Sequence, residues 1–231
     1  RFELSSLRAG FIGGAPYTPE QFHRMEAALD MTLIPVYGMS ECIGIACGDW
    51  RDDASLRAAC AGKIYSMNTC RILLSDGSEA ATGQTGEGWV TGPARMAGYY
   101  PRRIPEEELL PTGDLGFLDE QGYLHITGRK KDIIIRNGIN LSPKPIEDAL
   151  LSISGVSAAC VVGMPHPIQG EAPWAMVVSD RTAGELFALR PGLLPKNQIP
   201  VTIQVTDRMP TTGSGKIDKN AVREVLKQWN P

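Results

Sequence analysis

A short charged segment divides this chain into two parts with different patterns. The run Gly128-Arg129-Lys130-Lys131-Asp132 stands between two apolar stretches, Tyr123–Thr127 and Ile133–Arg136. Few core contacts cross a polar segment of this kind, which is typical of a domain boundary. We therefore expect one domain over residues 1–130 and a second, near the common domain size, over residues 131–231.

The first part begins with a strand–helix–strand pattern. Leu7–Ile12 is predicted to be a strand that ends at Gly13-Gly14-Ala15-Pro16. Thr18 and Gln21 have the spacing of a capping box, which predicts a helix start. The short apolar strand Thr32–Val36 follows. This order predicts the last piece of a larger α/β layer.

From about Ile43 to Thr127, short strands alternate with turn signals. Asp76-Gly77 and Asp119–Gly122 each separate two apolar runs, as in β-hairpins. This stretch predicts a small, mostly antiparallel β subdomain.

Beyond the charged segment the pattern predicts a compact α+β domain. Asn137-Gly138 is the strongest hairpin signal in the chain, and Ser142-Pro143 marks a helix start. Further strands are expected at Ala158–Gly163, Trp174–Ser179 and Val201–Thr206. A final helix from Lys219 is expected to carry Val222, Val225, Leu226 and Trp229 on one side. The expected fold class is thus an α/β fragment, an antiparallel β subdomain and an α+β carboxyl-terminal domain.

Composition removes several classes of partner. Lys and Arg total 23 against 26 Asp and Glu, so we expect neither nucleic acid nor an anionic membrane as partner. No apolar run approaches the roughly 20 residues that span a bilayer, and no signal peptide is evident. The five cysteines form no CxxC pair, which favours free thiols in a reducing cytoplasm over a metal site. The first residue is Arg1, so we expect the start of the gene product to lie upstream.

Tyr37-Gly38-Met39-Ser40-Glu41 places an aromatic ring, a hydroxyl and a carboxylate at the end of a strand. Ligands bind beyond the carboxyl ends of strands in α/β sheets. Tyr37 is suited to stack on a base, Ser40 to bond a phosphate oxygen and Glu41 to hold Mg²⁺. An ordinary strand exit with a solvated glutamate remains the alternative.

Asp114, Arg129 and Lys216 have side chains suited to bind a ribose, a phosphate or another anion. In Thr112-Gly113-Asp114 a carboxylate on a glycine turn can accept hydrogen bonds from both hydroxyls of a ribose. The guanidinium of Arg129 can reach a phosphate or ribose oxygen. Thr211–Lys216 is no Walker loop, because Ile217 takes the Ser/Thr position, but it brings a mobile ammonium to an anion. A surface turn with a solvated lysine is the alternative.

Together these segments resemble the adenylate-forming superfamily. It includes acyl- and aryl-CoA synthetases, firefly luciferase and the adenylation domains of peptide synthetases. The motifs that occur in its order and approximate spacing are Gly13–Pro16, Tyr37–Glu41, Thr112–Asp114, Gly128–Asp132 and Thr211–Lys216. The resemblance covers essentially the whole chain. The run from Gly128 to Gly138 is more similar to acyl- or aryl-CoA ligases than to the adenylation domains of peptide synthetases.

The resemblance implies an ATP-dependent ligase that activates a carboxylic acid as an acyl-adenylate and passes it to a thiol. It implies ATP, Mg²⁺ and coenzyme A, or the phosphopantetheine of a carrier protein. The family's phosphate loop lies upstream of these motifs, so we expect this chain to be a fragment without it. Two alternatives stay open: an acyl-AMP ligase that loads a carrier protein, and a non-catalytic interaction fragment.

The resemblance also implies roles for individual residues. Glu41 would bind Mg²⁺, and Lys216 would bridge the substrate carboxylate and the α-phosphate. The residues implied to bind the nucleotide are Gly14, Ala15, Tyr37, Gly38, Ser40, Asp114 and Arg129.

The second half of the chain carries implied roles as well as departures from the family. Lys131 falls at the family's domain hinge, while Gly138 and Asn140 fall in the loop that lines its pantetheine tunnel. Asn137 stands where many relatives have glycine, although Asn tolerates the left-handed region. The stretch Asp180–Ile199 is shorter than usual, so one helix is expected to be trimmed.

Overall fold

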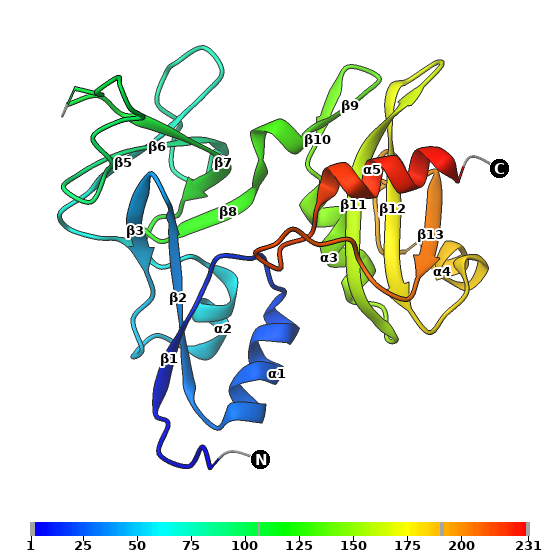
Figure 1. The fold of residues 1–231 in the computed structure, drawn as a ribbon, viewed down its shortest axis with the longest axis horizontal. Helices are drawn as coiled ribbons and strands as arrows, with labels where there is room; N and C mark the ends of the chain where they lie inside the picture. The colour runs from blue at the N-terminus through cyan, green and yellow to red at the C-terminus, as the bar shows by residue number, and fades with distance from the viewer. Residues whose placement is uncertain (1–2, 106, 190–191, 230–231) are drawn as a thin grey trace. The chain divides into compact units, whose positions relative to one another are not determined.

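A computed structural model describes residues 3–105, 107–189 and 192–229. The chain divides into two compact units, Arg1–Lys130 (unit 1) and Lys131–Pro231 (unit 2). The fold is mixed α/β with several sheets in which antiparallel pairs predominate (Figure 1).

Unit 1 begins with a sheet in the order β1-β2-β3-β4. Its strands are β1 (Ala9–Ile12), β2 (Thr32–Met39), β3 (Cys42–Cys47) and β4 (Lys63–Ile64). β1 pairs with β2 in parallel, as the strand–helix–strand pattern requires, and β3 and β4 add on in antiparallel fashion. The first two strands of the expected β subdomain therefore extend this sheet instead.

Helices α1 (Pro19–Leu29) and α2 (Ala54–Ala59) pack on the first sheet through Phe22, Leu33 and Ala58. The capping box is confirmed: the Gln21 N–H donates to Thr18 Oγ1 over 3.2 Å, and the Thr18 N–H donates to Gln21 Oε1 over 2.9 Å. The sequence did not predict α2, a single short helix with no capping hydrogen bond from Asp53.

The second sheet of unit 1 runs in the order β5-β6-β7-β8, and every pair in it is antiparallel. Its strands are β5 (Thr69–Leu73), β6 (Gly86–Thr91), β7 (Leu110–Leu118) and β8 (Leu124–Arg129). The hairpin at Asp119–Gly122 is confirmed between β7 and β8. Asp76-Gly77 also turns the chain back on itself, closed by the antiparallel Leu73–Glu79 bridge and by the Leu74 N–H donating to the Ser78 carbonyl over 2.8 Å, while β5 pairs with β6 in the sheet.

Unit 2 is built on one sheet in the order β10-β9-β12-β11, with β13 parallel to β12. Its strands are β9 (Ile134–Arg136), β10 (Ile139–Leu141), β11 (Val156–His166), β12 (Gly170–Ser179) and β13 (Thr202–Thr206). The predicted hairpin is confirmed, with Asn137 and Gly138 at φ 52° and 76° between β9 and β10.

Alternating residues of β11 face two different helix layers. Val161 lies in a cluster with α3 (Pro143–Leu151) and α4 (Ala183–Leu189), whereas Val162 lies in a cluster with α5 (Lys219–Gln228). Because successive side chains of a strand point to opposite faces, α5 covers one face of the sheet and α3 and α4 the other (Figure 1). The segment 180–199, in which one helix is expected to be trimmed, contains α4, a helix of 7 residues.

Only part of the apolar side of α5 is fully buried. Val222 and Leu226 are fully buried, but Val225 and Trp229 are 39% and 47% exposed. A helix lying on a flat sheet buries an i, i+4 line most deeply, and residues on the flank of that line stay partly in solvent. Of the four residues that the sequence places on one side of this helix, Val222 and Leu226 therefore form its core contact.

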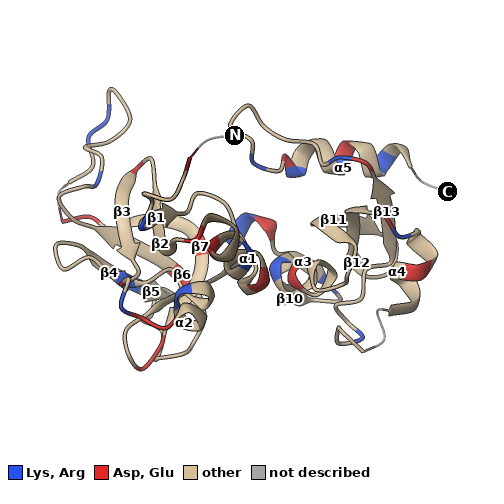
Figure 2. Ribbon diagram, turned by 90° about the horizontal axis from the view of Figure 1, so that it is seen from below, with Lys and Arg blue, Asp and Glu red and all other residues tan. Residues whose placement is uncertain are grey.

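Acidic and basic residues are mixed along both units (Figure 2). Within the described ranges, no helix is long and apolar enough to cross a membrane. The cysteines in these ranges are free thiols.

Candidate active site

The candidate site lies at one end of β1 and β2. These strands run parallel with Ile12 beside Pro35, so the loops that follow them leave at the same edge. A Cβ atom at Gly13 would lie 2.4 Å from the Val36 carbonyl oxygen, which shows how closely the loop 13–15 approaches the end of β2. Gly14 has φ +80° and open space around it.

Tyr37, at the end of β2, is tied to the second sheet. Its hydroxyl donates to Asp114 Oδ2 over 2.7 Å, and Arg129 Nε lies 2.7 Å from Asp114 Oδ1. Asp114 and Arg129 face each other across β7 and β8. The structure thus brings together three residues that the sequence motifs nominated from separate positions.

The Asp114 backbone is held in place by Thr112. Thr112 Oγ1 donates to the Gly88 carbonyl over 2.8 Å and accepts the Asp114 N–H over 3.1 Å. Asp114 is only 6% exposed. Burial, followed by the Asp114 charge, raises the pKa of Tyr37 far above its usual value, so its hydroxyl stays protonated and donates.

Glu41 is held by a segment that the sequence motifs did not include. The Met96 N–H donates to the Glu41 carbonyl over 2.7 Å, and the Tyr99 hydroxyl donates to Glu41 Oε1. The hydrogen bond from Tyr99 is the main cause of a lowered pKa of Glu41, and the Arg129 charge acts in the same direction. Glu41 is therefore an ionised carboxylate with oxygen ligands of the kind that Mg²⁺ prefers.

The remaining sequence-nominated residues of unit 1 line this edge without joining the network. Gly38, near the end of β2, and Ser40, in the connection between β2 and β3, are exposed. A Cβ atom at Gly38 would lie 2.7 Å from Gly44 N, so glycine is required there by the close approach of two backbones. Ala15 is exposed in the loop after β1.

A second ion pair lies beside the network. Lys130 Nζ is 2.8 Å from Glu87 Oε2, and Glu87 is buried on β6. Arg129 and Lys130 are thus both attached to carboxylates of unit 1. Lys131, the next residue, is exposed and makes no ion pair with any residue that the structure describes. No sequence motif pointed to Glu87.

Unit 2 carries the other nominated residues. Lys216 is exposed in a tight loop, with its carbonyl accepting the Thr212 N–H over 2.7 Å. Gly138 and Asn140 are exposed at the β9–β10 hairpin. This part of the chain therefore presents one cationic loop and one glycine-containing hairpin to solvent.

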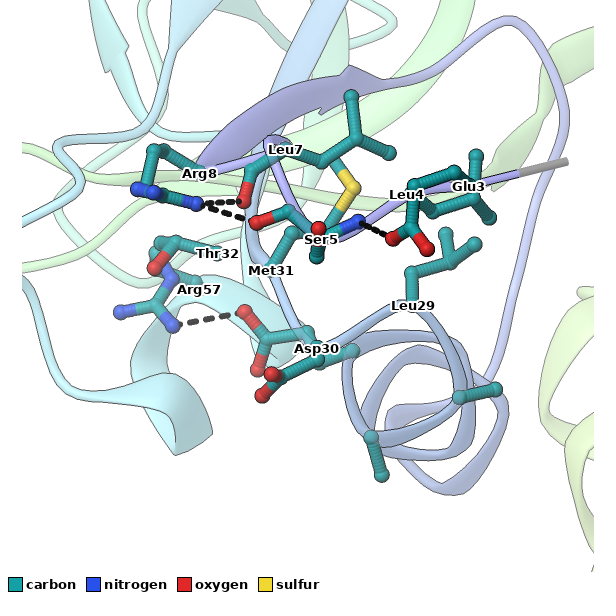
Figure 3. A pocket seen from close by; sticks show the side chains of 13 residues that line it. Glu3, Leu4, Ser5, Leu7, Arg8, Leu29, Asp30, Met31, Thr32 and Arg57 are labelled. Atoms are coloured by element: carbon teal, nitrogen blue, oxygen red, sulfur yellow. Dashed lines mark hydrogen bonds and ion pairs between the residues drawn. The ribbon is translucent and has the colours of Figure 1, made fainter.

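A pocket of about 770 Å³ lies elsewhere in unit 1 (Figure 3). It is lined by Arg8 and Thr32, which precede β1 and begin β2, so it lies at the end of these strands opposite Tyr37–Glu41. Arg57 on its wall donates to the Leu33 carbonyl and pairs with Glu26 at 2.8 Å. None of the nominated site residues lines it.

Comparison with known proteins shows which family the chain matches. Residues 1–100 match the family described as AMP-binding enzyme, and residues 145–216 match the AMP-binding enzyme C-terminal domain. The chain belongs to the AMP-binding enzyme family.

Named relatives are similar over almost the whole chain. Feruloyl-CoA synthase of an Amycolatopsis species is 36% identical over 96% of this chain and 47% of its own length. The amide bond synthetase McbA of Marinactinospora thermotolerans superposes with a TM-score of 0.88 at 33% identity, over 97% of this chain and 48% of that chain. The o-succinylbenzoate CoA synthetase of Bacillus subtilis, solved with an acyl-adenylate intermediate, gives 0.81 at 31% identity, over 95% and 46%. The chain spans about half the length of these relatives.

The network predicts energetic coupling between Tyr37 and Asp114. Tyr37→Phe removes one hydroxyl and should cost about 1 kcal/mol of the free energy of unfolding. Asp114→Ala leaves that hydroxyl buried without its acceptor, so it should cost about 3 kcal/mol. In the double variant the loss should be smaller than the sum, by roughly 1 kcal/mol.

Urea unfolding of the four proteins gives this coupling. Thr206→Val, on a strand of unit 2, serves as a control with no contact to the network. Additive losses would show that the Tyr37–Asp114 hydrogen bond contributes nothing to the folded state.

Proposed function

We propose that the protein carrying this chain is an ATP-dependent acid–thiol ligase. It would activate a carboxylic acid as an acyl-adenylate and transfer the acyl group to a thiol such as that of coenzyme A. The observation that carries this proposal is the Tyr37–Asp114–Arg129 network beside an ionised Glu41, at the ends of the first strands. The names of the CoA synthetases among its relatives support the same class.

In this proposal Asp114 and Arg129 bind the ribose and Tyr37 lies against adenine. Each carboxylate oxygen of Asp114 accepts one hydrogen bond within the network. A carboxylate has about four lone-pair sites, so each oxygen keeps capacity for a ribose hydroxyl. Gly14 and Ala15 would border the base from the neighbouring loop, and the exposed Ser40 would touch a phosphate.

The first reaction step needs charge compensation more than covalent help. An oxygen of the substrate carboxylate attacks the α-phosphorus of ATP, and the bond to pyrophosphate breaks with its electron pair. Glu41 would hold Mg²⁺, which neutralises phosphate charge when bound. Lys216 would place its ammonium between the substrate carboxylate and the α-phosphate, where negative charge accumulates.

The second step transfers the acyl group to the sulfur of the thiol and releases AMP. Gly138 and Asn140 would line the approach of the pantetheine arm. Coenzyme A is the proposed acceptor because of the CoA synthetases among the relatives. A carrier protein is the alternative acceptor, and an assay that offers each in turn distinguishes the two.

The gene product that carries these residues should catalyse acid-dependent exchange of pyrophosphate into ATP. Ferulic acid, 2-succinylbenzoic acid and a long-chain fatty acid form a suitable panel. Lys216→Ala should lower the exchange rate by about 100-fold or more, because it removes the cation that stabilises the transition state. The 231-residue chain by itself, in which the family's phosphate loop is not expected, should show no exchange above the Lys216→Ala level.

Lys227→Ala is the control, since Lys227 is a solvent-exposed lysine paired with Glu224. Exchange that needs no acid, or that survives Lys216→Ala, would contradict the proposed function.

Lys131 and Lys216 should separate the two half-reactions. Lys131→Pro fixes φ near −65° and restricts Lys130 to extended conformations. If unit 2 turns about Lys131 between the steps, this variant should slow thioester formation far more than adenylate formation. Lys216→Ala should do the reverse and leave thioester formation from pre-made acyl-adenylate largely intact.

Both half-reactions are timed separately in variants shown to be folded by their melting curves, with Lys131→Ala as control. Equal slowing of both steps by Lys131→Pro would refute the hinge. Equal damage to both steps by Lys216→Ala would refute its role in adenylation alone.

A further inference from the structure

An ion-pair network inside unit 2 involves no residue of the proposed catalytic set. Lys219 is the first residue of α5, and its Nζ lies 3.0 Å from Asp132 Oδ2 and 3.3 Å from Glu147 Oε1. The side chains of Asp132 and Glu147 are 12% and 14% exposed, and that of Lys219 is 26% exposed. These charges are therefore largely removed from solvent.

The ammonium of Lys219 lies at the end of α5 where a positive charge is unfavourable, so other groups must stabilise it. The amino-terminal end of a helix carries a partial positive charge, so a cation there is unfavourable. Asp218 caps the helix by accepting the N–H groups of Asn220 and Ala221. Burial acts to lower the pKa of Lys219, but the charges of Glu147 and Asp132 outweigh it and raise the pKa, so the ammonium persists at neutral pH.

The network joins parts of unit 2 that are distant in sequence. Asp132 directly follows Lys131, the proposed hinge. Glu147 belongs to α3, and its Oε1 also accepts the Val161 N–H of β11 over 2.9 Å. Lys219 therefore connects the first residues of unit 2 to the central strand layer.

The loop that carries Lys216 is attached directly to this network. Thr211 and Ile217 form a bridge across the base of the loop, and the Asp218 N–H donates to the Pro210 carbonyl over 2.9 Å. Lys219 follows this closed base without any intervening flexible residue. Whatever holds Lys219 also holds the root of the Lys216 loop.

We propose that Lys219, together with Asp132 and Glu147, is a positioning residue for Lys216. The network fixes the root of the Lys216 loop to the first residue after the hinge, so that a turn about Lys131 carries Lys216 with it as part of one rigid body. The catalytic role of Lys216 rests on the proposed function, but the attachment of its loop to the Lys219 network does not. A solvated lysine on a flexible loop has many positions, and anchoring the loop root reduces their number before substrate arrives.

The test compares three variants of the 231-residue chain by ¹⁵N relaxation of backbone amides. Lys219→Met removes the charge and keeps an apolar stem, Lys219→Arg keeps a cation, and Lys227→Met removes the exposed lysine of the same helix. In Lys219→Met the order parameters of residues 213–216 should fall from about 0.8 to below about 0.6. Lys219→Arg and Lys227→Met should leave these order parameters unchanged. The order parameters of residues 167–169, a turn distant in sequence, should stay the same in every variant.

A role in stability alone would lower the melting temperature of Lys219→Met and leave the loop as ordered as in the wild type. That result would overturn the proposal. If Lys219→Met does not fold, the double variant Asp132→Ala/Glu147→Gln replaces it, because it removes both carboxylates that Lys219 Nζ contacts. An unchanged loop in the folded double variant would likewise overturn the proposal.

The relaxation measurement needs neither substrate nor catalysis. An absence of pyrophosphate exchange in the gene product would therefore contradict the proposed function and leave the link between Lys219 and the loop intact. In an active gene product, Lys219→Met should lower kcat for adenylate formation with little change in KM for ATP. Lys219→Arg should keep kcat close to the wild-type value.

Discussion

The buried carboxylate of Asp114 holds the two sheets of unit 1 together at the candidate site. One of its oxygens accepts from Tyr37 on β2 and the other from Arg129 on β8. A buried charge is tolerated only when it is paired and hydrogen-bonded, so the positions of both partners are constrained at once. The same carboxylate therefore fixes two parts of unit 1. One is the end of β2 that leads into Tyr37–Glu41, and the other is β8, the strand that precedes Lys131.

Local features of the fold could be predicted because their causes lie within a few residues. The capping box of Thr18 and Gln21 and the Asn137-Gly138 hairpin depend on side chains and backbone angles that neighbours determine. The motif order also nominated Tyr37, Asp114 and Arg129 together. Their mutual contacts add a physical basis to that grouping, since a hydroxyl and a half-exposed guanidinium both donate to the buried carboxylate of Asp114.

Contacts between distant residues could not be predicted. Tyr99 donates to Glu41 across 58 positions of sequence, and Lys130 pairs with Glu87 across 43. No spacing rule connects such pairs, because the sheet pairing that brings them together is decided by packing of the whole unit. The exposure of Val225 and Trp229 has a similar origin: periodicity identified the apolar side of α5, but the flat sheet beneath it decides how much of that side is covered.

A nucleotide site built on the Asp114 network should recognise adenine and ribose with residues of unit 1 alone. Titrating AMP into the ¹⁵N-labelled 231-residue chain tests this most directly. We predict saturable amide shifts confined to residues 13–15, 37–41, 112–114 and Arg129, which Asp114→Asn weakens strongly while unit 2 stays unchanged. Shifts centred instead on the pocket of Arg8, Thr32 and Arg57, or saturation that Asp114→Asn leaves untouched, would contradict the account.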